Sequence, residues 1–458
     1  MKAQGTTVSK AVSKPGTRAG SKSQWKSASP LHLGIIAGGG SLPAEIARSV
    51  TGRGGSVHIA MIEGEADDAL RTFPHTVLNW AELGRAVRVF KRAGVKDMIM
   101  VGRMSRPSFK TAKPDFGFLF SLPKIIKALR AGGDDAVLRG VVRLFEARRF
   151  RVLSVADVAP ELLIAEGPLG FHRPIGADEA DVARGMSLIS ALGRYDIGQA
   201  VVVSNGKIEG IEGAEGTDRM VRRIGDLRTA AGIDVASLRS GVLVKRPKPG
   251  QDTRLDLPAI GPETVEGAVQ SGLSGIAGLT GEVLAANRYE MVDRADRAQI
   301  FITGVGAADP GAPASPEPAP RIEPIVFGRL AIPPERVSDV ENGVRIMGAL
   351  ADFATGSALV IAGGRVVAVG AGESSADVIQ RARSYFNRKR RNAVLIVGAS
   401  EALDEALIRA AAAAGLAGVI VMFGPGDGPR HKGPVLDVAD RFQMFIAGAA
   451  ADPRVAAF

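Results

Sequence analysis

A segment near the end of the chain repeats an earlier one, and this repeat constrains the fold more than any other feature. Residues Asp339 to Val369 parallel Asp181 to Ile211 position for position. Two shorter matches follow in the same order: Ala414 to Val421 with Ser271 to Gly278, and Asp440 to Gly448 with Asp296 to Gly304. Self-similarity of this kind is typical of a duplicated structural unit. We therefore predict that the C-terminal third is a degenerate copy of the domain before it.

The first half of the chain alternates short apolar strands with helical patterns. A strand begins at Leu31, and a helix opens near Ser41 with Pro43 in its first turn. Further segments follow, with strands at Ser56 to Glu63, Thr76 to Trp80 and Asp97 to Gly102, and helices at Glu82 to Arg92, Ser121 to Arg130 and Asp134 to Arg149. Such alternation predicts a parallel sheet with helices on both faces. The expected fold class is α/β, with an N-terminal Rossmann-like domain, a second α/β domain and a repeat of the second.

Changes in composition along the chain suggest the domain boundaries. Residues 1–30 contain Ser, Thr, Lys, Gly and Ala with almost no apolar periodicity, which predicts a disordered basic tail. The expected Rossmann-like N-terminal domain is 31–166, and the expected second α/β domain is 167–305. A Pro/Ala-rich linker at 306–324 precedes the copy at 325–458.

The composition excludes several classes of chemistry. The chain has no cysteine, so disulfides, thiolate zinc sites and cysteine nucleophiles are ruled out, and an intracellular location is expected. The formal charge is +10, but six Lys and Arg residues lie before residue 30, where there is no Asp or Glu. The rest is only mildly basic and has no basic stripe interleaved with aromatic residues, so we expect no nucleic-acid binding.

A triple glycine, Gly38, Gly39 and Gly40, lies between the first strand and the first helix. Glycines let the backbone approach a ligand closely, and the N-terminus of the helix near Ser41 would present free N–H groups to a phosphate. The dinucleotide fingerprint GxGxxG is matched only in part, because Pro43 holds the place of its third glycine. A tight strand-to-helix turn without a ligand is the alternative.

A charged loop runs from Lys245 to Gly261, with the sequence KRPKPGQDTRLDLPAIG. Asp256 lies between Leu255 and Leu257, so in an extended chain its carboxylate points away from two leucines that would face a core. Cations at Lys245, Arg246, Lys248 and Arg254 suit a phosphorylated ligand, while the carboxylate binds a metal or orients water. A solvated basic loop is the alternative.

Six motifs together resemble the LpxI-type UDP-2,3-diacylglucosamine pyrophosphatases of lipid A biosynthesis. They are AGGGSLP (from Ala37), GRMSRPSF (from Gly102), GGDDAVLRG (from Gly132), GRYDIGQ (from Gly193), EGTD (from Glu215) and the charged loop. They occur in the order found in that family, over about Leu31 to Val305. The resemblance implies a two-domain, Mg²⁺-dependent enzyme, with its site between the domains, that hydrolyses UDP-2,3-diacylglucosamine to UMP and the lipid monosaccharide phosphate.

The resemblance also implies roles for particular residues. The essential aspartate of the family falls on Asp256, as metal ligand or water-orienting base, with Asp218 as a second metal ligand. The expected substrate contacts are Gly38, Gly39, Gly40, Ser41, Gln199, Thr217, Asp218, Lys245, Lys248, Gln251 and Arg254. Thr217 or Asp218 as a helix N-cap is the structural alternative.

The substrate is amphipathic, so we expect a cytoplasmic protein in peripheral contact with the inner membrane, and a homodimer is possible. Two other functions remain open. One is a non-catalytic UDP-sugar-binding or regulatory protein, and the other is a dinucleotide-dependent oxidoreductase with Glu63 on a ribose.

The C-terminal copy lacks the residues that carry the expected chemistry. Ala354 stands opposite Asp196, Ala376 stands opposite Asp218, and IVGASEALDE replaces the charged loop. Apolar residues are kept at the matching strand positions. We therefore expect a packing or dimerisation module and no second active site.

Overall fold

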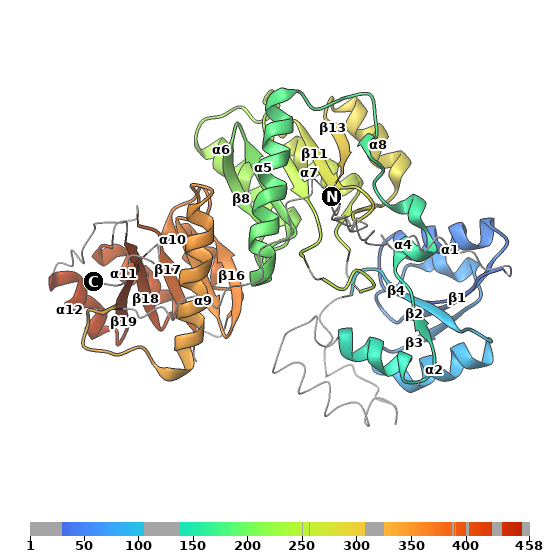
Figure 1. Cartoon of the computed structure of the whole chain (residues 1–458), viewed down its shortest axis with the longest axis horizontal. Helices are drawn as coiled ribbons and strands as arrows, with labels where there is room; N and C mark the ends of the chain where they lie inside the picture. Colours follow the sequence, from blue (N-terminus) through green and yellow to red (C-terminus); the bar gives the residue numbers. More distant parts are fainter. Residues whose placement is uncertain are drawn as a thin grey trace, which may run out of the picture.

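The computed structural model describes residues 30–104, 138–249, 251–255, 257–306, 325–386, 389, 391–399, 403–423 and 433–450. These residues form three α/β units that follow one another along the chain, with the middle unit between the other two (Figure 1). Three predicted segments lie outside them: the basic tail, the linker and the helix at 121–130. Within the described residues, no helix is long and apolar enough to cross a membrane.

The N-terminal unit is a five-stranded sheet in which every pairing is parallel. The strand order is β3 (His75–Leu78), β2 (Ser56–Ile62), β1 (His32–Ala37), β4 (Asp97–Val101) and β5 (Arg151–Val152). One face is covered by α1 (Leu42–Gly52) and α4 (Val155–Val158), and the other by α2 (Leu83–Arg92) and the helical residues 138–146. The predicted parallel sheet with helices on both faces is confirmed.

The middle unit is a six-stranded sheet. Its order is β6 (Gly167–Pro168), β13 (Phe301–Val305), β11 (Gly275–Leu279), β9 (Val242–Lys245), β7 (Ala200–Ser204) and β8 (Lys207–Ile211). The strands β9, β11 and β13 are parallel. The strands β7 and β8 form a hairpin at Asn205-Gly206, a residue pair typical of tight turns, and both residues have positive φ. Helix α5 (Gly176–Leu192) covers one face, while α6 (Thr217–Ala230), α7 (Pro262–Gln270) and α8 (Arg288–Arg297) cover the other.

The C-terminal unit has the same strand order and the same pattern of strand directions. Its order is β14 (Ile325–Val326), β19 (Phe445–Ala450), β18 (Gly418–Phe423), β17 (Ala393–Val397), β15 (Ala358–Ala362) and β16 (Arg365–Val369). The hairpins of both units also carry a register shift at equivalent positions, Val202/Val203 and Val360/Ile361. Helix α9 (Pro334–Ala351) lies on one face, and α10 (Ser375–Ala382), α11 (Glu405–Ala414) and α12 (Gly433–Arg441) lie on the other.

The helices α5 and α9 pack against each other between the two sheets. One apolar cluster contains residues of both helices and of both sheets, including Leu188, Leu192, Met347 and Leu350. The middle and C-terminal units therefore share a continuous core.

Candidate active site

The charged loop leaves the middle sheet where β9 ends, at Lys245. The parallel strands β11 and β13 end at the same edge, and ligands of open α/β sheets bind at this edge. The described part of the loop includes every residue from Arg246 to Pro258 except Gly250 and Asp256. Asp256, the predicted catalytic residue, thus lies outside the described residues.

Contacts within the middle unit hold the first half of the loop. Lys248 Nζ donates to Asp196 Oδ1 (2.6 Å) and to the Asp196 carbonyl (3.2 Å). The backbone N–H of Arg246 donates to the Gln199 carbonyl at 3.0 Å. Pro249 packs so closely on Gly193 that a Cβ atom at Gly193 would lie 2.2 Å from the ring. The structure therefore brings the motif at 193–199 against the charged loop, although about fifty residues separate them in sequence.

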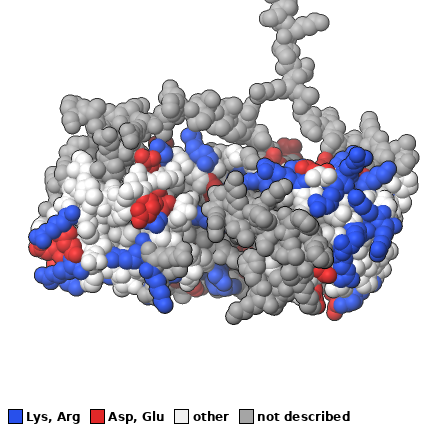
Figure 2. Space-filling view, turned by 90° about the horizontal axis from the view of Figure 1, so that it is seen from below, with Lys and Arg blue, Asp and Glu red and all other residues white. Residues whose placement is uncertain are grey.

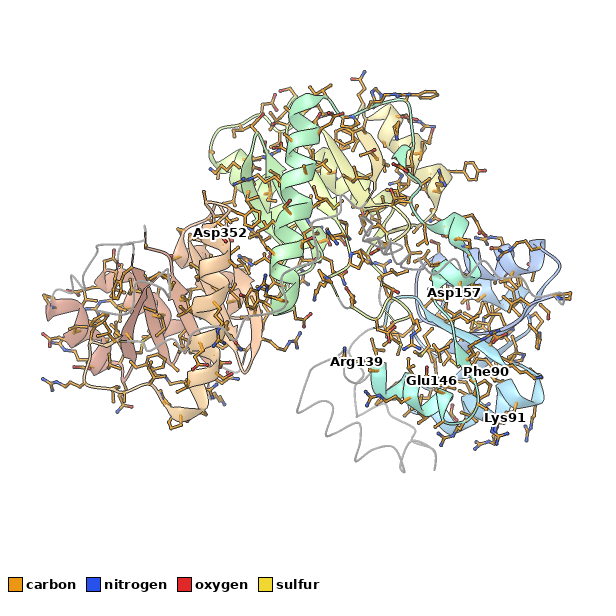
Figure 3. All side chains as sticks on the ribbon, viewed as in Figure 1. Phe90, Lys91, Arg139, Glu146, Asp157 and Asp352 are labelled. Atoms are coloured by element: carbon orange, nitrogen blue, oxygen red, sulfur yellow. The ribbon has the colours of Figure 1, made fainter. Side chains whose placement is uncertain are left out.

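Contacts with the N-terminal unit hold the second half of the loop. Arg254 pairs with Asp252 (2.7 Å) and with Glu146 Oε1 (2.9 Å), which belongs to the N-terminal unit. Figure 3 shows Glu146 on the helix that also carries Arg139. Leu255 packs against the apolar cluster around Phe90 and Phe145, and Leu257 packs against the cluster on the opposite face of the same sheet. The prediction that both leucines face a core is confirmed only in part, because they pack on opposite faces of the N-terminal sheet and not against one core.

Lys245 joins the two ends of the loop. Its side chain is buried, and Nζ donates to the Ala259 carbonyl at 2.9 Å. Ala259 begins the short strand β10 (Ala259–Ile260), which pairs with β12 (Leu284–Ala285). The amine at this position holds the neck of the loop closed, so its predicted contact with phosphate stays a prediction.

Hydrogen bonds to Arg254 shift two pKa values within the loop. The side-chain hydrogen bond from Arg254 lowers the pKa of Asp252, and the same bond raises the pKa of Arg254, with Glu146 adding to the effect. The charge of Arg254 is thus matched by two carboxylates of the protein, which favours a role as a clamp between units over neutralisation of phosphate.

Gln199 and Thr217 meet at a carboxylate that the sequence analysis missed. Glu212 Oε2 accepts from the Gln199 backbone N–H (2.8 Å), and Glu212 Oε1 accepts from Thr217 Oγ1 (2.9 Å). The only signal in the sequence was an acidic residue just after the segment that forms the β7–β8 hairpin. Arg246 was also left out of the expected substrate contacts. It is half-buried, it donates to Ser190 Oγ at 2.6 Å, and burial lowers its pKa.

The suggested N-cap roles of Thr217 and Asp218 are wrong. The N-cap of α6 is Gly216, with φ 83°, and Thr217 is the first helical residue. Glycine takes the N-cap position because this backbone conformation disfavours a side chain. The carboxylate of Asp218 is exposed in the first turn of α6.

The three N–H groups of the triple glycine all donate within the protein. The N–H of Gly38 donates to the Val101 carbonyl (2.9 Å), that of Gly39 to the Arg103 carbonyl (2.8 Å) and that of Gly40 to Asp67 Oδ2 (3.0 Å). A Cβ atom at Gly38 would lie 2.3 Å from the Arg103 carbonyl oxygen. The glycines allow close packing of the turn on the chain after β4, and substrate contact through them or through Ser41, the N-cap of α1, stays a prediction.

The turn nevertheless lies beside the middle unit. Arg103 Nη1 is 3.7 Å from Glu263 of α7, and Glu45 of α1 accepts from the Asn287 backbone N–H at 3.1 Å. The described residues of the loop, the turn and the start of α7 and α8 therefore all meet at the junction of the first two units.

Among the described residues, no three His, Asp or Glu side chains come together in a way that would hold a metal ion. Mg²⁺ commonly takes one or two protein carboxylates and fills its other positions with water and phosphate oxygens. The exposed carboxylate of Asp218 has the right chemistry for such a site, and the second predicted ligand is Asp256.

The clamp role of Arg254 leads to a double-mutant prediction. Arg254→Met and Glu146→Gln break the same ion pair, so each is expected to lower kcat/KM about tenfold, roughly 1.4 kcal/mol, and the double variant should be no worse than Arg254→Met. Steady-state kinetics of the three variants would measure this. If Arg254→Met lowers kcat/KM a hundredfold more than Glu146→Gln does, Arg254 contacts the phosphates of the substrate instead.

The fold and the junction define a class: a two-unit α/β protein with a charged loop at the carboxyl ends of parallel strands, held by both units. Residues 32–162 match the family model for the LpxI N-terminal domain, and residues 165–303 match that for the LpxI C-terminal domain. The chain is 37% identical over 273 residues to UDP-2,3-diacylglucosamine pyrophosphatase LpxI of Caulobacter vibrioides, a match that covers 97% of that protein and 60% of this chain. The chain belongs to the LpxI family.

Proposed function

We propose that this protein hydrolyses the pyrophosphate bond of UDP-2,3-diacylglucosamine, with water, to UMP and 2,3-diacylglucosamine 1-phosphate. The observation that carries the proposal is the match to nearly the whole length of a protein named for this activity. The arrangement at the junction supports it, because the loop that carries Asp256 is held between the two units that this match covers.

Charge and positioning dominate hydrolysis of this bond, since phosphoryl transfer requires little covalent chemistry from the protein. In the proposed mechanism, Asp256 orients the attacking water and accepts its proton, while Lys248, held by Asp196, faces the phosphoryl oxygens. Glu212 fixes Gln199 and Thr217 for contact with the substrate. A Mg²⁺ ion held by Asp256 and Asp218 would neutralise phosphate charge when bound.

Incubation of the purified protein with UDP-2,3-diacylglucosamine and Mg²⁺ tests the function. We expect release of UMP and the lipid 1-phosphate, and loss of that activity in excess EDTA with recovery when Mg²⁺ is restored. Tight binding of a UDP-sugar without turnover would support the binding-protein alternative, and binding of NAD(H) would support the oxidoreductase. Full activity in EDTA would remove the metal from the mechanism.

We also propose that the protein works in the cytoplasm, in peripheral contact with the inner membrane, through the N-terminal unit. Lys and Arg side chains gather over this unit (Figure 2). The exposed cations come from two helices that cover the same face of the sheet and from the residues that follow them: Arg85, Arg88, Lys91, Arg92, Lys96, Arg139, Arg143, Arg149 and Arg151. Each basic residue near an anionic lipid surface contributes about 1 kcal/mol.

Charge reversal tests the membrane contact. The triple variant Lys91→Glu, Arg92→Glu and Arg143→Glu is expected to bind anionic phospholipid vesicles about 100-fold more weakly. The variant loses the favourable contribution of three basic residues to the binding free energy. The control variant Arg173→Glu, Lys207→Glu and Arg365→Glu has the same net charge and should bind within about threefold of wild type. An equal loss in the control would show that only the net charge matters.

A further inference from the structure

Four charged side chains meet where the middle and C-terminal units contact each other. Arg223 donates to Glu215 (2.7 Å) of its own unit and to Glu373 (3.1 Å) of the other unit. Arg381 donates to Glu373 of its own unit and to Glu215 (3.2 Å) of the other. The carboxylates are almost fully buried, at 4% exposed for Glu215 and 1% for Glu373. Each arginine therefore bridges both units.

These four residues are equivalent in pairs under the internal repeat. The shift of 158 positions that relates Asp181 to Asp339 also relates Glu215 to Glu373 and Arg223 to Arg381. Residue 215 thus contacts the equivalent of residue 223 across the interface, and residue 223 contacts the equivalent of residue 215. Reciprocity of this kind is the mark of a two-fold interface between identical subunits.

Other contacts show that the two units have equivalent local structure. Asp181 accepts from the N–H groups of Asn205 (2.8 Å) and Gly206 (2.6 Å), and Asp339 accepts from those of the equivalent residues Gly363 (3.2 Å) and Gly364 (2.6 Å). The apolar face between the units is equivalent as well. Ile189 and Leu192 of α5 correspond to Met347 and Leu350 of α9, and all four are buried in the shared cluster.

We propose that the C-terminal unit takes the place of a second copy of the middle unit, so that the protein is a single-chain pseudo-dimer and works as a monomer. The surface of the middle unit that carries α5, Glu215 and Arg223 therefore fits the middle unit of another copy of the chain. In the intact chain the C-terminal unit covers this surface and prevents that contact. The LpxI family models match residues 32–162 and 165–303. The surface built by α5, Glu215 and Arg223 lies within the second range, whereas the C-terminal unit that covers it lies outside both.

Charge swaps within one unit test the proposal. Glu373→Arg combined with Arg381→Glu keeps the ion pair inside the C-terminal unit and makes both contacts to the middle unit repulsive. Adding Glu215→Arg and Arg223→Glu restores all four contacts with reversed signs. The control is Glu405→Arg with Arg409→Glu, which swaps an exposed pair on α11.

A protease site introduced between residues 306 and 324 allows the chain to be cut after folding. The uncut wild type should have the mass of one chain, 47.6 kDa, in solution. After cutting, the two wild-type fragments and those of the control should elute together. In the swap confined to the C-terminal unit, the fraction of cut chains whose fragments elute together should fall below a tenth. The released N-terminal fragment should then elute at twice the mass of a single fragment. The fourfold swap should restore co-elution.

Two results would overturn the proposal. If the released N-terminal fragment has the mass of one fragment at tens of micromolar, the surface is not self-complementary. If the fourfold swap fails to restore co-elution while remaining folded by circular dichroism, the reciprocal contacts do not define the interface. Neither readout depends on enzymatic activity.

Discussion

Asp256→Ala is expected to lower kcat by at least a thousandfold, about 4 kcal/mol in barrier, with substrate affinity and fold retained. The residues on either side of Asp256 are packed in two separate apolar clusters, so the loop stays in place when the carboxylate is removed. In the proposed mechanism the lost group acts mainly in the transition state, and such losses appear in kcat. Single-turnover kinetics and calorimetric binding of the substrate would measure the two effects separately.

The control for this prediction is Asp226→Ala, which removes an exposed carboxylate on α6 of the same unit. It should retain wild-type turnover. If Asp256→Ala stays within about tenfold of wild type, Asp256 is only a structural residue of the loop.

Lys248→Met is expected to lower kcat/KM about 100-fold. The change keeps the length of the side chain but removes a charge that would face the phosphates, and hydrogen bonds to charged groups contribute about 1.5–3 kcal/mol. The side chain is mostly buried and is oriented by Asp196. Lys207→Met, at an exposed lysine of the β7–β8 hairpin, should be unaffected.

The variant Asp196→Asn separates positioning from charge. It keeps the carbonyl contact to Lys248 but weakens the side-chain pair, so its loss should be smaller than that of Lys248→Met. A normal kcat/KM in Lys248→Met with a lowered free energy of unfolding would mean that the pair serves only to stabilise the loop.

The sequence allowed most elements of the first unit to be predicted because the apolar periods are clear. The predicted helix at Glu82 to Arg92 is observed as α2, and the strand predicted at Ser56 to Glu63 is observed as β2. The charged loop could be selected from its residues alone, and both of its leucines were expected to contact apolar residues, as they do. Local patterns report on local structure, and these features depend on neighbours in sequence.

Features that depend on distant contacts could not be predicted. Nothing in the residues near Gly38 shows that carbonyls of Val101 and Arg103 will occupy the N–H groups of the glycine turn. The pair between Arg254 and Glu146 joins residues 108 positions apart, and single-sequence patterns carry no such information. The sequence therefore indicated which residues were charged but not which of those charges were already matched.

The internal repeat separates backbone features that the fold requires from contacts that only one copy makes. Ala354 has φ 48°, close to the φ 58° of the equivalent Asp196, although alanine disfavours this left-handed conformation by about 1–2 kcal/mol. The turn into the strand therefore requires this backbone whether or not a carboxylate is present. The left-handed conformation of Asp196 belongs to the fold, and the contact with Lys248 is an addition to it.

The attachment of the charged loop also limits how the enzyme can move. The loop is fixed to the middle unit at Lys245, while Leu255 and Leu257 pack against apolar clusters of the N-terminal unit. Rigid-body separation of these units would have to extract both leucines or stretch the segment between Lys248 and Arg254. If substrate entered and products left by such a hinge motion, that motion would break the attachment of the charged loop to one of the units. Each turnover would then begin with the attachment forming again.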